Sequence, residues 1–197
     1  MLVLASRSTG RRALLENAGI PHDVMTAPID EGAAKASLRA EGLSARDLAD
    51  ALAEMKALKV SAKRPGDLVL GCDQTLALDD GIMFDKAPDL ATLVGQLRQL
   101  SGKTHSLFSA IVLAEQGQPV WRHVERVRMT VRPLSDAFIA DYLEAEGDDL
   151  LGCVGGYRIE GLGVQLFSRI EGSHFAIVGL PLLPLLDFLR MRGIVAT

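Results

Sequence analysis

The sequence predicts a mixed α/β fold in which helices flank a twisted sheet of parallel and antiparallel strands. A short apolar strand followed by a helix opens the chain, as in a parallel unit, and residues 104–132 alternate with a period of two, as in a long antiparallel hairpin. With 197 residues, 48% of them apolar, the chain can bury a core as one domain, or as two closely packed lobes that share it.

The first half of the chain contains a strand, two helices and a second strand before its hairpin. Leu14, Leu15 and Ala18 share one face of the first helix, and Ser44 with Asp47 forms a start like a capping box for the long one. Predicted in order are a strand at 2–5, helices at 11–19 and 44–64, a strand at 67–73, a hairpin at 76–84 and a helix at 88–100.

The second half alternates first and then returns to helical periodicity. Strands are expected at 105–113 and 120–131, joined by the turn EQGQP. A helix at 135–146, a glycine-rich loop at 152–163, a strand at 164–170, a turn at 171–173 and a helix at 181–193 complete the prediction.

The charge balance gives no general attraction to nucleic acid or anionic lipid, because 21 Lys and Arg oppose 25 Asp and Glu for a net charge of -4. No apolar run approaches the roughly 20 residues that cross a bilayer. In MLVLASRSTGRR the basic residues follow the apolar ones, the reverse of a signal peptide. Cys72 and Cys153 lie outside any CxxC pattern, which is typical of buried thiols in a reducing compartment. We therefore expect a cytoplasmic protein.

A phosphate site is predicted where the first strand meets its helix, at Ser6-Arg7-Ser8-Thr9-Gly10-Arg11-Arg12. Cations in the first turn of a helix oppose its dipole, so Arg11 and Arg12 are unfavourable there unless an anion is bound. Backbone N–H groups, serine hydroxyls and guanidinium groups all donate to phosphate oxygens. The alternative is a solvated basic turn beside a serine N-cap. The spacing of a Walker loop is absent.

Asp73 follows the apolar run LVLGC, at the carboxyl end of a predicted central strand, where open α/β sheets bind ligands. A carboxylate there can bind a divalent metal or take a proton from water, and Asp30-Glu31, expected in a loop before the long helix, is the second source of metal ligands. The alternative for Asp73 is a turn or capping role.

Other polar residues have plainer interpretations. Lys56 is expected to point away from the apolar stripe of its helix, and Lys86 lies between the hairpin and the next helix, so each alone is typical of a solvated lysine. The segment 101–105 is typical of a helix stop and turn. The four histidines lack metal-ligand spacing, so no zinc site is predicted.

A row of arginines lies on one face of the predicted strand at 120–131 and just beyond it, at Arg122, Arg126, Arg128 and Arg132. A basic strand face can meet nucleic acid. This one lacks interleaved aromatic residues and belongs to an acidic chain, which favours a solvated face.

The sequence resembles the Maf family of nucleoside triphosphate pyrophosphatases from Leu4 to about Leu189, in LASRSTGRRALL, LAEMKA, LVLGCDQ, DKAPD, LSGKTHS, GGYRIEGLG and IEGSHFAIVGLPLLPLL. The resemblance implies an elongated α/β fold of the Maf and ITPase type, with two lobes around a central nucleotide-binding cleft, commonly in a homodimer. It also implies cleavage between the α- and β-phosphates of a nucleoside triphosphate, with Mg²⁺ or Mn²⁺, to give the monophosphate and pyrophosphate.

By position, the resemblance makes Asp73 the proton acceptor or metal-binding aspartate of the family. Attack of water on the α-phosphorus needs a positioned nucleophile and cations that neutralise the departing pyrophosphate, and the basic residues supply those cations. The expected catalytic residues are Asp73, Lys86 and Glu31, the metal ligands are Asp73 and Glu31, and the substrate-binding residues are Ser6, Ser8, Gly10, Arg11, Arg12, Lys56, Gln74 and Glu160.

Gly10, Gln74 and Glu160 correspond to positions that determine base specificity in the family. Gln74 and Glu160 are similar to the branch that acts on 7-methyl-GTP, and a carboxylate can accept hydrogen bonds from the N1–H and N2–H₂ edge of guanine. Gly10 matches neither known branch, Thr9 stands where proline is usual, and Ala87 stands where Lys-Pro is typical.

The leading interpretation is a metal-dependent pyrophosphatase that removes modified nucleotides such as 7-methyl-GTP. The first alternative, implied by the family's association with septum inhibition, is a regulator of cell division that binds triphosphates without turnover. The second is a nucleic-acid-binding protein that uses the arginine row, whose binding would depend on salt.

Overall fold

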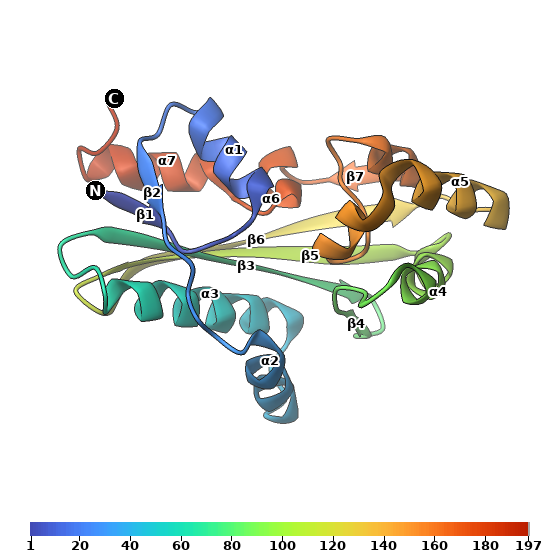
Figure 1. The fold of residues 1–197 in the computed structure, drawn as a ribbon, viewed down its shortest axis with the longest axis horizontal. Coiled ribbons are helices and arrows are strands. Elements are labelled where there is room, and N and C mark those ends of the chain that lie inside the picture. The colour runs from blue at the N-terminus through green and yellow to red at the C-terminus, as the bar shows by residue number, and fades with distance from the viewer. Residues whose placement is uncertain (197) are drawn as a thin grey trace. The chain divides into compact units, whose positions relative to one another are not determined.

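The computed structural model describes residues 1–196 and confirms the mixed α/β fold (Figure 1). The strands form one sheet in the order β2-β1-β3-β5-β6-β7, with β4 on β3. Strand β1 pairs in parallel with β2 and β3, whereas β3 with β4 and β6 with β7 are antiparallel. The strands are β1 (Leu2–Leu4), β2 (His22–Val24), β3 (Leu68–Leu78), β4 (Met83–Phe84), β5 (Thr104–Glu115), β6 (Gln118–Val131) and β7 (Phe167–Glu171).

The chain divides into two compact units. Unit 1 holds residues 1–74, 109–125 and those from 179 onward, and unit 2 holds residues 75–108 and 126–178, so β3, β5 and β6 contribute residues to both. Unit 1 carries helices α1 (Thr9–Asn17), α2 (Glu31–Ala40), α3 (Ala45–Ser61) and α7 (Leu182–Met191). Unit 2 carries α4 (Leu90–Leu100), α5 (Asp136–Glu146), α6 (His174–Val178) and the 3₁₀ turns η1 (Gly147–Gly152) and η2 (Leu162–Leu166).

In unit 1, helices cover both faces of the strands. Figure 1 shows α3 along one side of them and α1 with α7 along the other. Helix α3 begins as predicted, because the Ser44 hydroxyl accepts a hydrogen bond from the Asp47 backbone N–H at 3.2 Å. It buries Leu48, Leu52 and Val60, whereas Met55 is exposed. Among the described residues there is no helix with the length and apolarity that a membrane span requires.

Unit 2 has its own apolar core. The predicted hairpin around Asp80-Gly81 is confirmed, with Leu76 opposite Phe84 and Gly81 at φ +88°. Helices α4 and α5 bury their apolar residues in one cluster with the strands, which includes Leu76, Leu93, Leu97, Leu107, Met129, Tyr142 and Tyr157.

Three predictions about elements were wrong. Asp30-Glu31 does not lie in a loop, because Asp30 caps α2 by accepting from the Ala33 backbone N–H at 3.0 Å and Glu31 is the first residue of that helix. Residues 164–166 form part of η2 instead of a strand, and Asp73 lies inside β3 and not at its carboxyl end, because that strand continues to Leu78. Helix α2 and strand β2 were not predicted. Helix α2 buries none of its residues and β2 is three residues long, so neither shows the apolar periodicity by which the other elements were recognised.

A fully buried histidine lies at the centre of unit 2. His105 Nε2 forms a hydrogen bond with the hydroxyl of Tyr157 at 2.8 Å, and that hydroxyl also lies 3.4 Å from Met129 Sδ. His105 Nδ1 is also buried and has no partner within residues 1–196. Burial lowers the pKa of His105 from 6.5 to about 4, against a smaller opposing effect of Asp79. The imidazole is therefore neutral in the folded protein at pH 7.

We expect acid to destabilise the protein through His105. Between pH 6.5 and 4, His105 binds a proton in the unfolded chain but not in the folded chain. Its contribution to the free energy of unfolding is therefore complete above pH 6.5 and is lost as the pH falls towards 4. The free energy of unfolding should fall by about 1.4 kcal/mol per pH unit in this window, roughly 3 kcal/mol in all. Urea denaturation from pH 7 to 4 measures it. The slope should decrease in His105→Gln and persist in His174→Gln, whose side chain is exposed. Equal slopes for both variants would contradict the assignment.

Candidate functional site

Three of the predicted charged residues meet in unit 1. The ammonium Nζ of Lys56, from α3, lies 2.6 Å from Oδ1 of Asp73, in β3, and 3.0 Å from Oε1 of Glu31, at the start of α2. The side chains of Lys56 and Asp73 are 10% and 6% exposed, whereas that of Glu31 is 47% exposed. The cluster is therefore open to solvent on the side of Glu31.

The alternative interpretation of Lys56 as a solvated lysine that points away from the apolar stripe of α3 was wrong, because its side chain is 10% exposed. Helix α3 packs tightly on β3, since a Cβ at Gly71 would lie 2.1 Å from the Ala53 carbonyl oxygen and 2.6 Å from the Ala57 backbone nitrogen. Small residues on this face of α3 allow that approach and bury the neighbouring Lys56. The lysine reaches the strand because helix and strand are in backbone contact.

Asp73 has one satisfied and one unsatisfied oxygen. Lys56 donates to Oδ1, but Oδ2 is buried with no hydrogen-bond partner in the described part of the chain. A buried carboxylate oxygen without a partner is costly, which marks a place for a ligand or a proton. Oδ2 is thus the atom of this cluster that can take a proton from water or bind a cation.

The carboxylates suit a hard divalent cation. Glu31 and Asp73 both direct an oxygen at one positive charge, that of Lys56, and the second oxygen of Asp73 is unused. Within residues 1–196 no three His, Cys, Asp or Glu side chains form a complete metal site. Magnesium commonly uses one or two carboxylates and takes its other ligands from water and substrate phosphates, so the donor set fits that ion and Mn²⁺.

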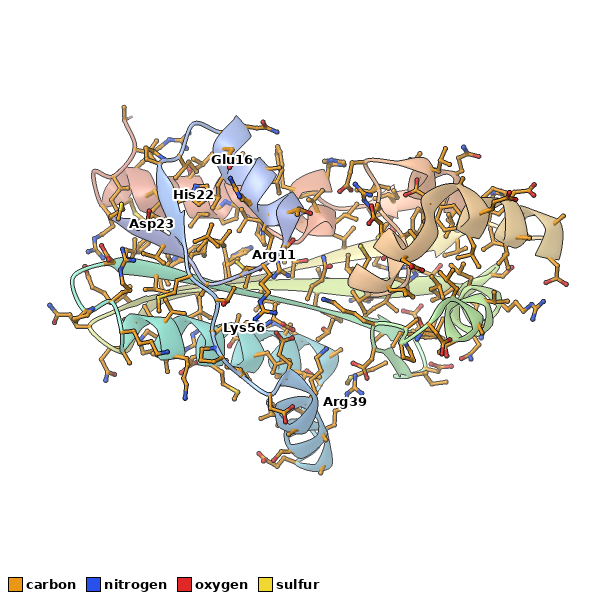
Figure 2. The ribbon with its side chains drawn as sticks, viewed as in Figure 1. Arg11, Glu16, His22, Asp23, Arg39 and Lys56 are labelled. Atoms are coloured by element: carbon orange, nitrogen blue, oxygen red, sulfur yellow. The ribbon has the colours of Figure 1, made fainter. Side chains whose placement is uncertain are left out.

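The predicted phosphate loop is tightly organised. Ser8 caps α1, accepting from the Arg11 backbone N–H at 3.3 Å, and the Ser6 hydroxyl accepts from the Ser8 backbone N–H at 3.2 Å. The Arg11 guanidinium donates to Ser6 Oγ and to the carbonyl of Cys72, the residue before Asp73. The loop therefore contacts β3 next to the charged cluster. Figure 2 shows Arg11 and Lys56, which approach β3 from α1 and α3.

The two arginines of the first turn differ in their partners. Arg12 forms a surface ion pair with Glu16 at 2.7 Å, and both side chains are at least half exposed. Arg11 is partly buried, and its acceptors are a hydroxyl and two carbonyl groups, with no carboxylate among residues 1–196. The Arg11 guanidinium therefore lies beside the N-terminus of α1 without an ion-pair partner in the part of the chain that the structure describes.

Cys72 lies near both Arg11 and Lys56. Burial raises the pKa of its thiol to about 11, and Arg11 and Lys56 both lower it to a smaller extent. Both cations thus act on the same residue of β3. Cys72 is a buried free thiol, as predicted, whereas Cys153 is free but only partly buried, which differs from the prediction.

The remaining predicted site residues are distributed over both units. Gly10 is in the first turn of α1, and Gln74 donates from Nε2 to the hydroxyl of the buried Ser109 at 2.8 Å. Lys86 and Glu160 belong to unit 2, where both act on Cys153. Burial raises the pKa of that thiol, Glu160 raises it further and Lys86 lowers it. Roles for Lys86 and Glu160 at a substrate remain predictions.

The arginine row of β6 is not a free basic face. Each member has a partner: Arg122 binds Asp50 at 2.7 Å and Glu54 at 2.6 Å, Arg128 binds Asp79 at 3.0 Å, Arg126 donates to Ser106, and Arg132 lies 4.1 Å from the centre of the Phe138 ring. These partners favour the interpretation as a solvated strand face.

Reasoning from sequence overlooked Gly179. Its carbonyl oxygen accepts from Arg11 Nε at 2.8 Å across 168 positions of the chain. The available signal was a glycine in the segment IVGLP, directly before the closing helix, but nothing local to it indicates the contact with Arg11.

The profile of a family described as Maf-like protein matches residues 1–192. The chain is 53% identical to proteins named nucleoside triphosphate pyrophosphatase from Hyphomonas neptunium, covering 100% of this chain and 98% of the relative, and from Caulobacter vibrioides, covering 98% and 96%. It is 52% identical to a protein named 7-methyl-GTP pyrophosphatase from Brucella abortus, covering 96% of this chain and 94% of the relative. A nucleoside-triphosphatase structure from Mycobacterium abscessus, 20% identical over 66% of this chain and 72% of that chain, gives a TM-score of 0.36.

Proposed function

Because this chain belongs to the Maf family, we propose that it is a nucleoside triphosphate pyrophosphatase, a hydrolase of acid anhydrides that releases a nucleoside monophosphate and pyrophosphate. One arrangement of residues in the structure supports this function most directly. The unsatisfied oxygen of Asp73 lies in a cluster with Lys56 and Glu31, and the residue before Asp73 binds Arg11 of the phosphate loop. A base and two cations are thus held together on β3.

Each residue has a role that its contacts support. Arg11 and the N-terminus of α1 bind phosphate oxygens, because both present N–H donors and positive charge. Lys56 neutralises phosphate charge and holds Oδ1 of Asp73 in place. Asp73 Oδ2 accepts a proton from the attacking water or serves as a metal ligand.

Glu31 and Asp73 are the residues that would hold Mg²⁺ or Mn²⁺. A divalent cation bound there neutralises charge on the phosphate oxygens. Glu31 is the more exposed of the two carboxylates, and it is the first residue of a helix with no buried side chain. It can therefore change partner at lower cost than Asp73.

The substrate we favour is a guanine nucleotide similar to 7-methyl-GTP. The relatives from Brucella abortus and Brucella suis, 52% and 53% identical, are named for that activity. Gln74 lies next to Asp73 in β3, and its amide nitrogen is held by Ser109. Glu160 supplies a carboxylate of the kind that accepts from the guanine edge. We also propose that the protein acts in the cytoplasm as a homodimer, on the basis of its free thiols and of the family resemblance respectively.

A pyrophosphate-release assay with Mg²⁺ or Mn²⁺ tests the function. The panel holds the standard triphosphates, 7-methyl-GTP, 5-methyl-UTP and pseudo-UTP, with metal-free reactions as the control. We expect selective turnover, highest for 7-methyl-GTP, and little without metal. Turnover of a triphosphate with another base would refute the assignment of 7-methyl-GTP as the substrate but not the pyrophosphatase activity. Nucleotide binding without any product would instead favour the regulator of cell division.

A further inference from the structure

Gly179 lies between α6 and α7, far in sequence from the phosphate loop but in direct contact with it. Its carbonyl oxygen accepts a hydrogen bond from Arg11 Nε at 2.8 Å. Its φ angle is +109°, a conformation that residues with a side chain rarely adopt. The contact and the unusual backbone occur at the same residue.

The guanidinium of Arg11 is held at two of its three nitrogens. Nε donates to Gly179, and Nη1 donates to Ser6 Oγ at 3.2 Å and to the Cys72 carbonyl at 3.1 Å. Because the guanidinium is planar, these acceptors from three segments determine its plane and the direction of Nη2. Nη2 has no hydrogen bond to any residue that the structure describes. The two N–H groups of Nη2 are thus fixed in the guanidinium plane and have no acceptor among residues 1–196.

No side chain fits at position 179 while Arg11 stays in place. A Cβ there would lie 2.9 Å from Arg11 Nε, 3.3 Å from Nη2 and 3.5 Å from Cζ. The close approach that forms the hydrogen bond therefore depends on glycine. Any larger residue must displace the guanidinium, the backbone of residue 179, or both.

We propose that Gly179 is a positioning residue for the substrate: it orients Arg11 so that Nη2 binds an oxygen of the triphosphate. The inference rests on the proposed function, in which Arg11 binds phosphate. Gly179 itself does not touch the nucleotide. Its effect passes through Arg11, which predicts that substitutions at the two positions will not be additive.

The first test compares Gly179→Ala with Gly193→Ala. Gly193 belongs to the same unit and also has a positive φ, +65°, but no atom lies within 4 Å of its Cβ position. It therefore tests the replacement of a positive-φ glycine without the contact, and comparison of Gly179→Ala in the two Arg11 backgrounds separates the remaining backbone strain at φ +109°. We expect Gly179→Ala to raise KM for the preferred triphosphate roughly 10- to 100-fold, the range for one charge-assisted hydrogen bond, with a smaller change in kcat. Gly193→Ala should keep the KM of the wild type.

The second test places Gly179→Ala in an Arg11→Ala background. If Gly179 acts through Arg11, KM in the double variant should equal KM in Arg11→Ala alone. An equal fold increase in both backgrounds, or an unchanged KM in the single variant, would overturn the proposal. Circular dichroism at the assay temperature establishes that each variant is folded.

Arg11→Lys covers the case in which Gly179→Ala does not fold. Lysine keeps the charge but lacks the planar group that Gly179 orients, so we expect KM to stay at least 10-fold raised. A KM equal to that of the wild type in Arg11→Lys would refute the need for orientation. If the wild type turns over no triphosphate, the proposed function fails, and calorimetric binding of inorganic tripolyphosphate to the same variants still decides whether Gly179 orients an anion-binding arginine. Equal affinities for wild type and Gly179→Ala would then overturn the inference.

Discussion

Asp73→Asn is expected to lower kcat for pyrophosphate release by a factor of roughly 10² to 10⁴, the range for loss of a general base. Asparagine keeps the shape of the side chain and an oxygen that accepts from Lys56, which now lies 2.6 Å from Asp73 Oδ1. It removes the charge and the basic oxygen at the Oδ2 position, which has no protein partner among residues 1–196. Steady-state kinetics with the preferred substrate measures the effect.

Asp67→Asn is the matched control for this substitution. Asp67 lies one position before β3 and forms ion pairs with Arg64 and the N-terminal amine, away from the charged cluster. We expect its variant to keep the kcat of the wild type, with a small loss of stability. Near-normal kcat in Asp73→Asn would rule out Asp73 both as the base and as an essential metal ligand.

Gly71→Ala is expected to lower the free energy of unfolding by about 3 kcal/mol or more, at the upper end of the range for overpacked cores. The added methyl group would lie 2.1 Å from the Ala53 carbonyl oxygen and 2.6 Å from the Ala57 nitrogen, which are backbone atoms and cannot rotate away. Strand β3 and helix α3 must therefore separate. Since Asp73 belongs to one and Lys56 to the other, kcat should fall as well.

Urea denaturation of Gly71→Ala and Gly95→Ala separates this clash from a general effect of replacing glycine. Gly95 lies inside α4 and has no atom within 4 Å of its Cβ position. Its replacement by alanine should leave stability unchanged or raise it by up to about 1 kcal/mol. A loss smaller than about 1 kcal/mol in Gly71→Ala would show that the two elements can shift apart cheaply.

Elements with a clear apolar period were predictable from the sequence. The Ser44 cap of α3, the hairpin at Asp80-Gly81 and the long strands β5 and β6 all follow from local patterns. Helix α2 was missed because it buries no residue and so carries no such pattern, although its cap, Asp30, is of a typical residue type.

In the candidate site too, some features were predictable from the local sequence and others depend on contacts with distant residues. The burial of Asp73 in a central strand was predictable from the apolar run before it, but its predicted place at the carboxyl end was wrong, because β3 continues to Leu78. The burial of Lys56 was not, because it depends on how closely α3 approaches Gly71 in another element. The contact between Arg11 and Gly179 has no local signal at all, since the two residues are 168 positions apart.

That separation has a consequence for synthesis of the protein on the ribosome. Arg11 is translated 168 residues before the carbonyl group that orients it. At 5 to 20 residues per second, the interval is roughly 8 to 34 s. During this time the nascent chain displays a guanidinium group that lacks one of its acceptors, beside a ribosome rich in phosphate. The loop that is made first is thus completed late, because the carbonyl group that accepts from Arg11 Nε is translated only just before the closing helix.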